Sequence, residues 1–227
     1  MTETQNKVIG VLGGYGPYAT ADFYRLILDA TPAEKDWDHP HVVIDSNPKI
    51  PSRARAFLYN EESPLKYMIE GVKRLKNAGA HFFVCPCNSA HYFIKKAIDK
   101  FDLPFLDMTE VVVKKVVESG KKKIGVIGSE VTVEGKVYDH ILAKNKIETV
   151  HVNDLSKVRK IIEHGKHNKD LEEGKTLLRE LIEELKNKGA EGIIYACTEL
   201  PIVLPSEEVD FLIFDTSKIL AQSATYY

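Results

Sequence analysis

The chain repeats one order of segments twice. In the first half, a strand-like apolar run surrounds Gly10, and Gly79-Ala80 precede a second apolar run. The same features recur around Gly125 and at Gly189-Ala190, at offsets of 115 and 110 residues. Short β-branched runs that alternate with longer stretches of helical period are typical of parallel β-α-β units. The repeat therefore predicts two similar α/β halves.

The ends of the two halves also match. Residues 104–109 and 211–216 are apolar runs that each finish in Asp and Thr, with a helix expected to start there. We expect a first α/β domain of residues 1–105 plus 209–227 and a second of residues 106–208. Each is expected to hold a mostly parallel sheet flanked by helices. A pseudo-twofold axis commonly relates such halves, so we expect the active site in the cleft between them.

Local signals place several elements of the first half. Pro17 and Pro64 suit first helical turns, and Gly79 is expected to close a helix. Residues 46–62 are rich in Pro, Asn, Ser and Arg and are expected to form a long loop, which in compact domains is often functional. Strands are expected at residues 8–12, 41–44 and 82–85.

Charge and hydropathy exclude several classes of partner. The 227 residues carry 31 Lys+Arg and 33 Asp+Glu, for a formal net charge of −2. Since this balance creates no basic field, nucleic acid is not expected as a partner. No apolar run approaches the length of a bilayer span, and residues 1–7 lack the apolar core of a signal peptide. We therefore expect no membrane association and a cytoplasmic location.

The chain has three cysteines: Cys85, Cys87 and Cys197. An odd number in a reducing compartment argues against a disulfide framework. The offset of 110 residues carries Cys87 onto Cys197, whereas Cys85 corresponds to Tyr195. We therefore interpret Cys85 as a core residue and the other two cysteines as a functional pair.

Both paired cysteines follow a strand and precede a helical segment. Ligands of open parallel sheets lie beyond the carboxyl ends of the strands, and a helix N-terminus favours the thiolate. The neighbours Asn88, Ser89 and Thr198 are small and polar, so together with backbone N–H groups they could hold a carboxylate. If Cys87 and Cys197 face each other across the cleft, one thiol can remove a Cα proton while the other returns a proton to the opposite face.

Several segments carry further motifs. Residues 13–20 form a glycine turn, and residues 31–33 and 39–40 lie before the second strand. Residues 47–53 form a loop with an arginine, and residues 86–91 and 196–199 contain the two cysteines. Together they resemble the aspartate/glutamate racemase superfamily over essentially the whole chain, most closely the cofactor-independent aspartate racemases. His91 and Glu199 favour that branch, because glutamate racemases usually have a small residue and His there. The resemblance implies two α/β domains with the active site between them, no cofactor, and frequently a homodimer.

The resemblance also implies roles for individual residues. Cys87 and Cys197 would be the acid/base pair, with Cys87 on the D-substrate side, and Arg53 would clamp a substrate carboxylate through its bidentate fork. The substrate-binding residues expected are Arg53, Lys166, Asn88, Ser89, Thr132, Thr198, Asn47 and Tyr15. Tyr15 replaces a common Met of the family, and Ser52 stands where aspartate racemases usually carry Asp. The implied activity is pyridoxal-phosphate-independent interconversion of L- and D-aspartate, or of a related acidic amino acid.

Alternative interpretations exist for some of these residues. The turn that starts at Gly14 fits the dinucleotide pattern G-x-G-x-x-A, but Asp45 lies 31 residues further on rather than the roughly 20 expected of a ribose-binding acid. His39 and His41 beside two aspartates could bind a metal, although an ordinary polar loop is favoured. Cys85 and Cys87 lack the C-x-x-C spacing of a redox or metal pair. We expect neither a cofactor nor a metal.

Two further functions remain open. Related families use this scaffold for other amino-acid racemisation, hydantoin racemisation, maleate isomerisation and decarboxylation. Outside enzymes, the chain could be an amino-acid-binding or sensory protein. The intact cysteine pair argues against the second class, and in every case the expected partner is a small amino acid.

Overall fold

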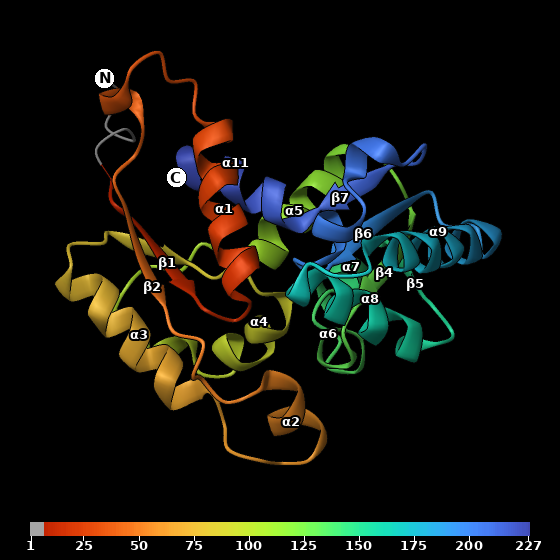
Figure 1. Ribbon diagram of the computed structural model, residues 1–227, viewed down its shortest axis with the longest axis horizontal. Coiled ribbons are helices and arrows are strands. Elements are labelled where there is room, and N and C mark those ends of the chain that lie inside the picture. Colours follow the sequence, from red (N-terminus) through yellow and green to blue (C-terminus); the bar gives the residue numbers. More distant parts are fainter. Residues whose placement is uncertain (1–6) are drawn as a thin grey trace. The chain divides into compact units, whose positions relative to one another are not determined.

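The computed structural model describes residues 7–227. The chain divides into two compact units (Figure 1). One contains the residues up to Met108 together with Ser217–Tyr227, and the other is the continuous segment Thr109–Thr216. Within the described residues, the strands of both units pair in parallel, which confirms the predicted α/β class.

The two sheets share one strand order. The first unit contains β1 (Ile9–Gly13), β2 (Val42–Ser46) and β3 (Phe82–Val84) in the order β2-β1-β3. The second contains β4 (Lys123–Gly128), β5 (Glu148–His151), β6 (Gly192–Ala196) and β7 (Ile213–Asp215) in the order β5-β4-β6-β7. Beside β3, where β7 would correspond, Phe105 makes a single parallel bridge with Phe83. The predicted repeat is therefore present in the topology as well as in the sequence.

Helices follow the strands of each unit, with short 3-10 segments between some of them. In the first half of the chain they are α1 (Pro17–Ala30), η2 (Asp36–Asp38), α2 (Arg53–Leu58), α3 (Leu65–Asn77), α4 (Asn88–Lys95) and η3 (Ile98–Lys100). The second half contains α5 (Met108–Glu118), α6 (Glu130–Glu134), α7 (Asp139–Lys144), α8 (Leu155–His167), α9 (Leu171–Asn187), α10 (Leu200–Val203), η4 (Ser206–Glu208) and α11 (Thr216–Thr225).

The equivalent glycines of the repeat serve the same packing purpose. Gly10 and Gly125 lie in the central strands of the two sheets. A Cβ on Gly10 would lie 3.3 Å from Cδ1 of Leu75 in α3, and one on Gly125 would lie 2.8 Å from Cδ1 of Leu185 in α9. In each unit, a leucine of the helix before the third strand therefore packs directly against the central strand.

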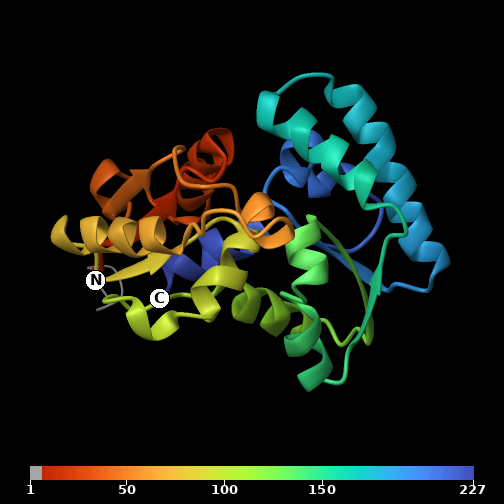
Figure 2. The ribbon, with the colours of Figure 1, turned by 90° about the horizontal axis from the view of Figure 1, so that it is seen from below.

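The C-terminal helix returns to the first unit, as Figure 2 shows by the blue segment at the C-terminus among red to yellow elements. The boundaries between the two units differ from the expected ones, which lay between residues 105 and 106 and between residues 208 and 209. Strand β7 pairs with β6 through Ile193–Ile213 and Tyr195–Asp215, so these residues belong to the second sheet and the chain crosses back only after Thr216. At the other boundary, the N–H of Leu106 donates to Phe83 O at 3.0 Å, which keeps this segment in the first unit.

The expected long loop at residues 46–62 is a wrong prediction in part, because α2 interrupts it. Ser52 caps this helix, with its Oγ accepting from the N–H of Arg55 at 3.3 Å. The residues that follow alternate Arg and Ala, which are strong helix formers. Phe57 then anchors the helix by an edge contact with Tyr92 of α4, at 4.9 Å between ring centroids.

The local predictions for strands and helix ends are otherwise confirmed. The three predicted strands are present, with their ends shifted by one or two residues. Pro17 is the first residue of α1 and Pro64 directly precedes α3. Gly79 follows α3 with a φ of +93°, a conformation that glycine adopts readily.

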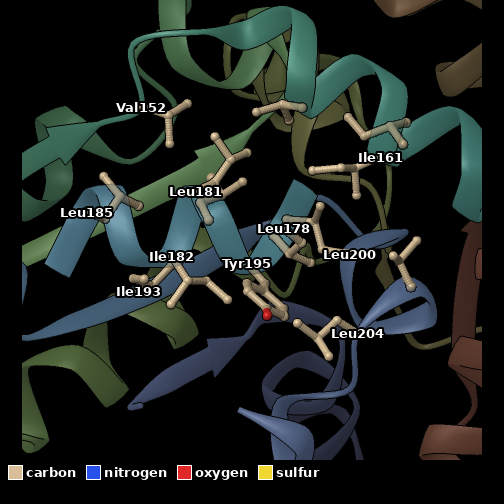
Figure 3. Packing of buried hydrophobic residues seen from close by; sticks show 14 of the residues in the cluster. Val152, Ile161, Leu178, Leu181, Ile182, Leu185, Ile193, Tyr195, Leu200 and Leu204 are labelled. Carbon is tan, nitrogen blue, oxygen red and sulfur yellow. The ribbon is translucent and has the colours of Figure 1, made fainter. Parts of the chain in front are cut away.

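The core of the second unit lies between α8, α9 and the sheet. Figure 3 shows Ile161, Leu178, Leu181, Tyr195 and Leu200 directed at one another. Each of these side chains is at most 1 % exposed. Burying an aliphatic side chain of this size contributes roughly 1.5–3 kcal/mol, so this cluster fixes α8 and α10 on the sheet. Over the described residues, we find no helix with the length and apolarity that a transmembrane segment requires.

Candidate active site

The first thiol lies where the repeat predicts, just beyond β3. Cys87 is the N-cap of α4 and is 8 % exposed. Its N–H donates to Cys85 O at 2.8 Å, and its Sγ lies 3.4 Å from Ser89 Oγ. Asn88 is the first residue of the helix and is buried. The thiol is therefore close to the positive end of α4 and to a neutral hydroxyl.

His91 fixes the backbone of this cysteine. The N–H of Met108 donates to His91 Nε2 at 3.2 Å, so the ring proton is on Nδ1, and this donates to Cys87 O at 3.0 Å. His91 is completely buried, and burial lowers the pKa of its imidazole. A neutral histidine therefore connects the Cys87 carbonyl to the start of α5. This contact favours a positioning role over that of a mere neighbour of the cap.

Arg53 lies at the start of α2 and contacts Tyr15. Its Nη2 donates to Tyr15 O at 2.9 Å, and its Cζ lies 4.8 Å from the centroid of the Tyr15 ring. This cation–π contact fixes the guanidinium. Gly14 makes the arrangement possible, because its φ is +88° and a Cβ there would lie 2.3 Å from the backbone N of Asn47. The close approach of the Gly14 loop to the Asn47 loop thus explains the glycine turn.

Two buried polar atoms in this region have no hydrogen-bond partner among the described residues: the Tyr15 hydroxyl and Arg53 Nε. Tyr15 is 6 % exposed and packs in one cluster with Cys85 and Cys87. Burial, followed by the neighbouring Cys85 and Cys87, raises the pKa of its phenol well above the usual range, and Arg53 opposes this shift. Arg53 Nε is thus a donor that a substrate carboxylate could use.

The second thiol lies just beyond β6 and has a different environment. Cys197 Sγ donates to Glu199 Oε2 at 2.9 Å, and Thr198 Oγ1 donates to the same oxygen at 3.2 Å. Glu199 is only 4 % exposed. Burial and then the Glu199 charge raise the pKa of the Cys197 thiol well above its usual value, while Lys166 lowers it.

The charge of Lys166 acts on this thiol because α8 packs closely on the residues after β6. A Cβ on Gly165 would lie 2.8 Å from Cβ of Glu199, so only a glycine permits this approach. Thr132 is nearby in α6 and is 1 % exposed. A Cβ on Gly128 would lie 3.0 Å from Thr132 Cγ2 and 3.1 Å from Cβ of Ala196, the residue before Cys197. These contacts assemble a second set of site residues.

The predicted site residues therefore fall into one set in each unit. The first unit holds Tyr15, Asn47, Arg53, Cys87, Asn88 and Ser89, and the second holds Thr132, Lys166, Cys197 and Thr198. Cys85 is completely buried in the core cluster, as predicted. Sequence reasoning named no role for Glu199, although its place two residues after Cys197 was a usable signal.

The loop with the two histidines has ordinary polar contacts. Asp38 Oδ2 accepts from the N–H groups of Glu34 and Lys35 at 3.2 and 3.0 Å. Among residues 7–227 we find no group of three or more His, Cys, Asp or Glu side chains that could hold a metal ion. The contacts of Asp38 are those of an ordinary polar loop.

Comparison with known proteins adds independent evidence. Residues 12–224 match the family described as Asp/Glu/Hydantoin racemase. The broad specificity amino-acid racemase RacX of Bacillus subtilis is 31% identical over 221 residues, covering 95% of this chain and 96% of that protein.

Solved structures of similar fold include an aspartate racemase from Picrophilus torridus, with a TM-score of 0.89, 29% identity and coverage of 96% of this chain and 93% of that one. A glutamate racemase from Francisella tularensis shares the fold, with a TM-score of 0.65 at 18% identity, over 96% of this chain and 79% of that one. The match over almost the whole chain and the two thiols beyond equivalent strands lead to one conclusion: the chain belongs to the Asp/Glu/hydantoin racemase family and is an amino-acid racemase of that superfamily.

Proposed function

We propose that the protein interconverts L- and D-aspartate, or a related acidic amino acid, by two-base proton transfer between Cys87 and Cys197. The observation that carries this proposal is the equivalent location of the two thiols, each beyond the third strand of its sheet. Small polar residues flank both thiols, and a cationic side chain adjoins each set: Arg53 in one unit and Lys166 in the other.

In the proposed reaction, one thiolate takes the Cα proton, so a C–H bond breaks and an S–H bond forms. The other thiol then protonates the opposite face of the carbanion, and its S–H bond breaks as the new C–H bond forms. The protein ends with thiol and thiolate exchanged. Negative charge develops on the substrate carboxylate, where Arg53 and the backbone N–H groups at the start of α4 would stabilise it. Both proton transfers use side chains of the chain itself, so no pyridoxal phosphate is invoked.

The charges of the site support an acidic substrate. Aspartate has two carboxylates, and the two sets of residues provide two cationic side chains, Arg53 and Lys166. Arg53 Nε is a buried donor without a partner in the described part of the chain, which suits a carboxylate ligand. The similarity to the Picrophilus torridus aspartate racemase supports the same choice.

A broader range of amino acids is the second candidate. RacX of Bacillus subtilis, which is described as a broad specificity racemase, is 31% identical over nearly the whole chain. Tyr15 also introduces a large ring next to Arg53, where the family commonly has Met. Both observations concern specificity rather than the chemistry of proton transfer.

A chiral separation of twenty amino acids incubated with the protein would distinguish the candidates. We expect racemisation of aspartate with incorporation of deuterium at Cα in D2O. Cys87→Ser and Cys197→Ser should each reduce racemisation by at least a hundredfold. Cys85→Ala, which removes the one thiol outside the pair, is the matched control. Full racemisation by either serine variant would refute the two-base proposal, and binding without turnover would favour an amino-acid-binding protein.

We also propose that the protein acts as a homodimer in the cytoplasm. The three cysteines are free, which suits a reducing compartment, and the resemblance noted from the sequence supports a dimer. Analytical ultracentrifugation at micromolar concentration would test the association. A monomer that racemises at the full rate would contradict it.

A further inference from the structure

We propose that Glu199 keeps Cys197 as a protonated thiol in the free protein, so that Cys197 starts as the acid of the pair and Cys87 is left to act as the first base. This inference rests on the two-base function proposed above and deepens it by assigning the resting proton. It makes the two thiols unequal before any substrate binds, although the repeat places them at equivalent positions.

The hydrogen-bond pattern at Glu199 supports the assignment. Oε2 receives two donors, Cys197 Sγ at 2.9 Å and Thr198 Oγ1 at 3.2 Å, and therefore acts as an acceptor. A thiolate cannot donate, so an ionised Cys197 would lie at 2.9 Å from a carboxylate of the same charge. The only other place for the shared proton is Glu199, but a carboxyl group is ordinarily a stronger acid than a thiol by about four pKa units. The proton accordingly stays on sulfur.

Other charged groups near Cys197 do not reverse this preference. Lys166 of α8 favours the thiolate, but its effect is the smallest of those acting on Cys197. From α9, Glu173 lies 3.6 Å from Nε2 of His164 in α8 and is used in that pair. Burial and then the Glu199 carboxylate raise the pKa of Cys197, and they outweigh the backbone N–H of Glu199 and Lys166, which lower it.

Among the contacts of the described residues, none joins the Cys87 thiol to a carboxylate. Its Sγ neighbours the neutral hydroxyl of Ser89 at 3.4 Å. The Cys85 thiol and the Tyr15 phenol lie near it, and burial raises the pKa of both. Arg53 lies against Tyr15, and the buried His91 donates to the Cys87 carbonyl. A negative charge is therefore better accommodated on Cys87 than on Cys197.

The asymmetry has a kinetic consequence. A turnover in which Cys87 is the base leaves Cys87 as a thiol and Cys197 as a thiolate beside Glu199, so a proton must pass from Cys87 back to Cys197, through solvent or by turnover of the opposite enantiomer, before the resting form returns. Because the equilibrium constant of a racemisation is one, kcat/KM is the same for both enantiomers. Glu199 can therefore change kcat/KM only by the same factor for both enantiomers, and any difference between the two directions must appear in the separate values of kcat and KM.

Alkylation by iodoacetamide tests the assignment without requiring turnover, because thiolates react and thiols do not. The rate at each cysteine would be followed by peptide mass spectrometry from pH 5 to 11 and normalised to its plateau, which removes differences in access. We expect the midpoint for Cys197 to lie above that for Cys87. Glu199→Gln should lower the Cys197 midpoint by one pH unit or more, which is about a tenfold faster reaction at a fixed pH below it.

Two variants control for structural effects. Glu199→Asp keeps the charge, so the Cys197 midpoint should stay above that of Cys87. Glu172→Gln removes an exposed carboxylate of the same unit and should leave both midpoints unchanged. A Cys197 midpoint at or below that of Cys87, or one unmoved by Glu199→Gln, would overturn the proposal. If the midpoints behave as expected but no amino acid is racemised, the proposed function fails while the proton assignment stands.

Discussion

Individual side chains of this protein acquire their chemistry from neighbours that are both near and distant in sequence, as Cys197 does from Glu199 and His91 from Met108. The repeat alone identifies Cys87 and Cys197, because their spacing is visible in the amino-acid order. The hydrogen bond from the Met108 N–H to His91 and the burial of the Glu199 side chain depend on rotamers and packing, which the spacing of residues in the sequence does not reveal. Sequence reasoning therefore finds the two proposed bases but not the groups that would set their protonation.

His91 gives a prediction about stability and pH. Its pKa is lowered by burial, so the unfolded state binds more protons than the folded state below about pH 6.5. The stability should therefore be complete at neutral pH and fall as the pH drops through about 6.5, by up to ~1.4 kcal/mol per pH unit from this one group. In His91→Asn this part of the pH dependence should vanish.

Urea denaturation of both proteins at pH 7.5, 6.5 and 5.5 measures this effect. His81, which accepts from the N–H of Val8 at 2.9 Å and is exposed, is a suitable control position. Parallel pH dependence of the wild type and His91→Asn would show that His91 does not remain neutral in the folded protein.

At the level of elements, the strands and long helices follow from apolar periodicity, and the missed features have identifiable causes. Helix α2 has only six residues, too few to show a helical period, and its stability comes from the Ser52 cap and the contact of Phe57 with α4. The assignment of β7 was missed for another reason. An apolar strand can pair with either sheet, and only its hydrogen bonds to β6 decide which.

The glycine turn yields a matched pair of variants. Gly14 and Gly79 both have positive φ, at +88° and +93°, so an alanine carries similar backbone strain at each, about 1–2 kcal/mol. A Cβ on Gly79 meets nothing within 4 Å, whereas one on Gly14 would collide with the backbone of Asn47. Gly14→Ala should therefore destabilise the protein by several kcal/mol more and displace Tyr15 and Arg53.

Thermal unfolding together with the KM for aspartate would separate the two effects. We expect Gly79→Ala to lower the Tm with an unchanged KM, and Gly14→Ala to lower the Tm further and raise the KM at least tenfold. Equal effects of the two variants would mean that the approach of the two loops is not needed for the site.

At the level of the whole chain, the first unit depends on its C-terminal segment. Leu220 and Ala221 of α11 are completely buried, and Tyr227 packs on Phe82 with ring centroids 4.5 Å apart. Lys7 Nζ also donates to Tyr227 O at 2.8 Å. The second unit is continuous in sequence and contains none of these residues.

Removal of residues 217–227 should therefore affect the two units unequally. We expect loss of amide protection in β1 and β3, while β4 and β6 keep most of theirs, since their core cluster lies within the second unit. Hydrogen exchange followed by mass spectrometry would measure this difference, with removal of Tyr226 and Tyr227 alone as a milder comparison. Equal loss of protection in both sheets would show that the units unfold as one.

The return of α11 to the first unit also determines the order in which the molecule can be completed on the ribosome. The second unit has its whole sequence once Thr216 has been made, whereas the first unit is then still incomplete. The first unit begins earlier but lacks most of α11 until residues 217–227 have been made. The half that contains Cys87 is therefore the first to be synthesised and the last to be finished.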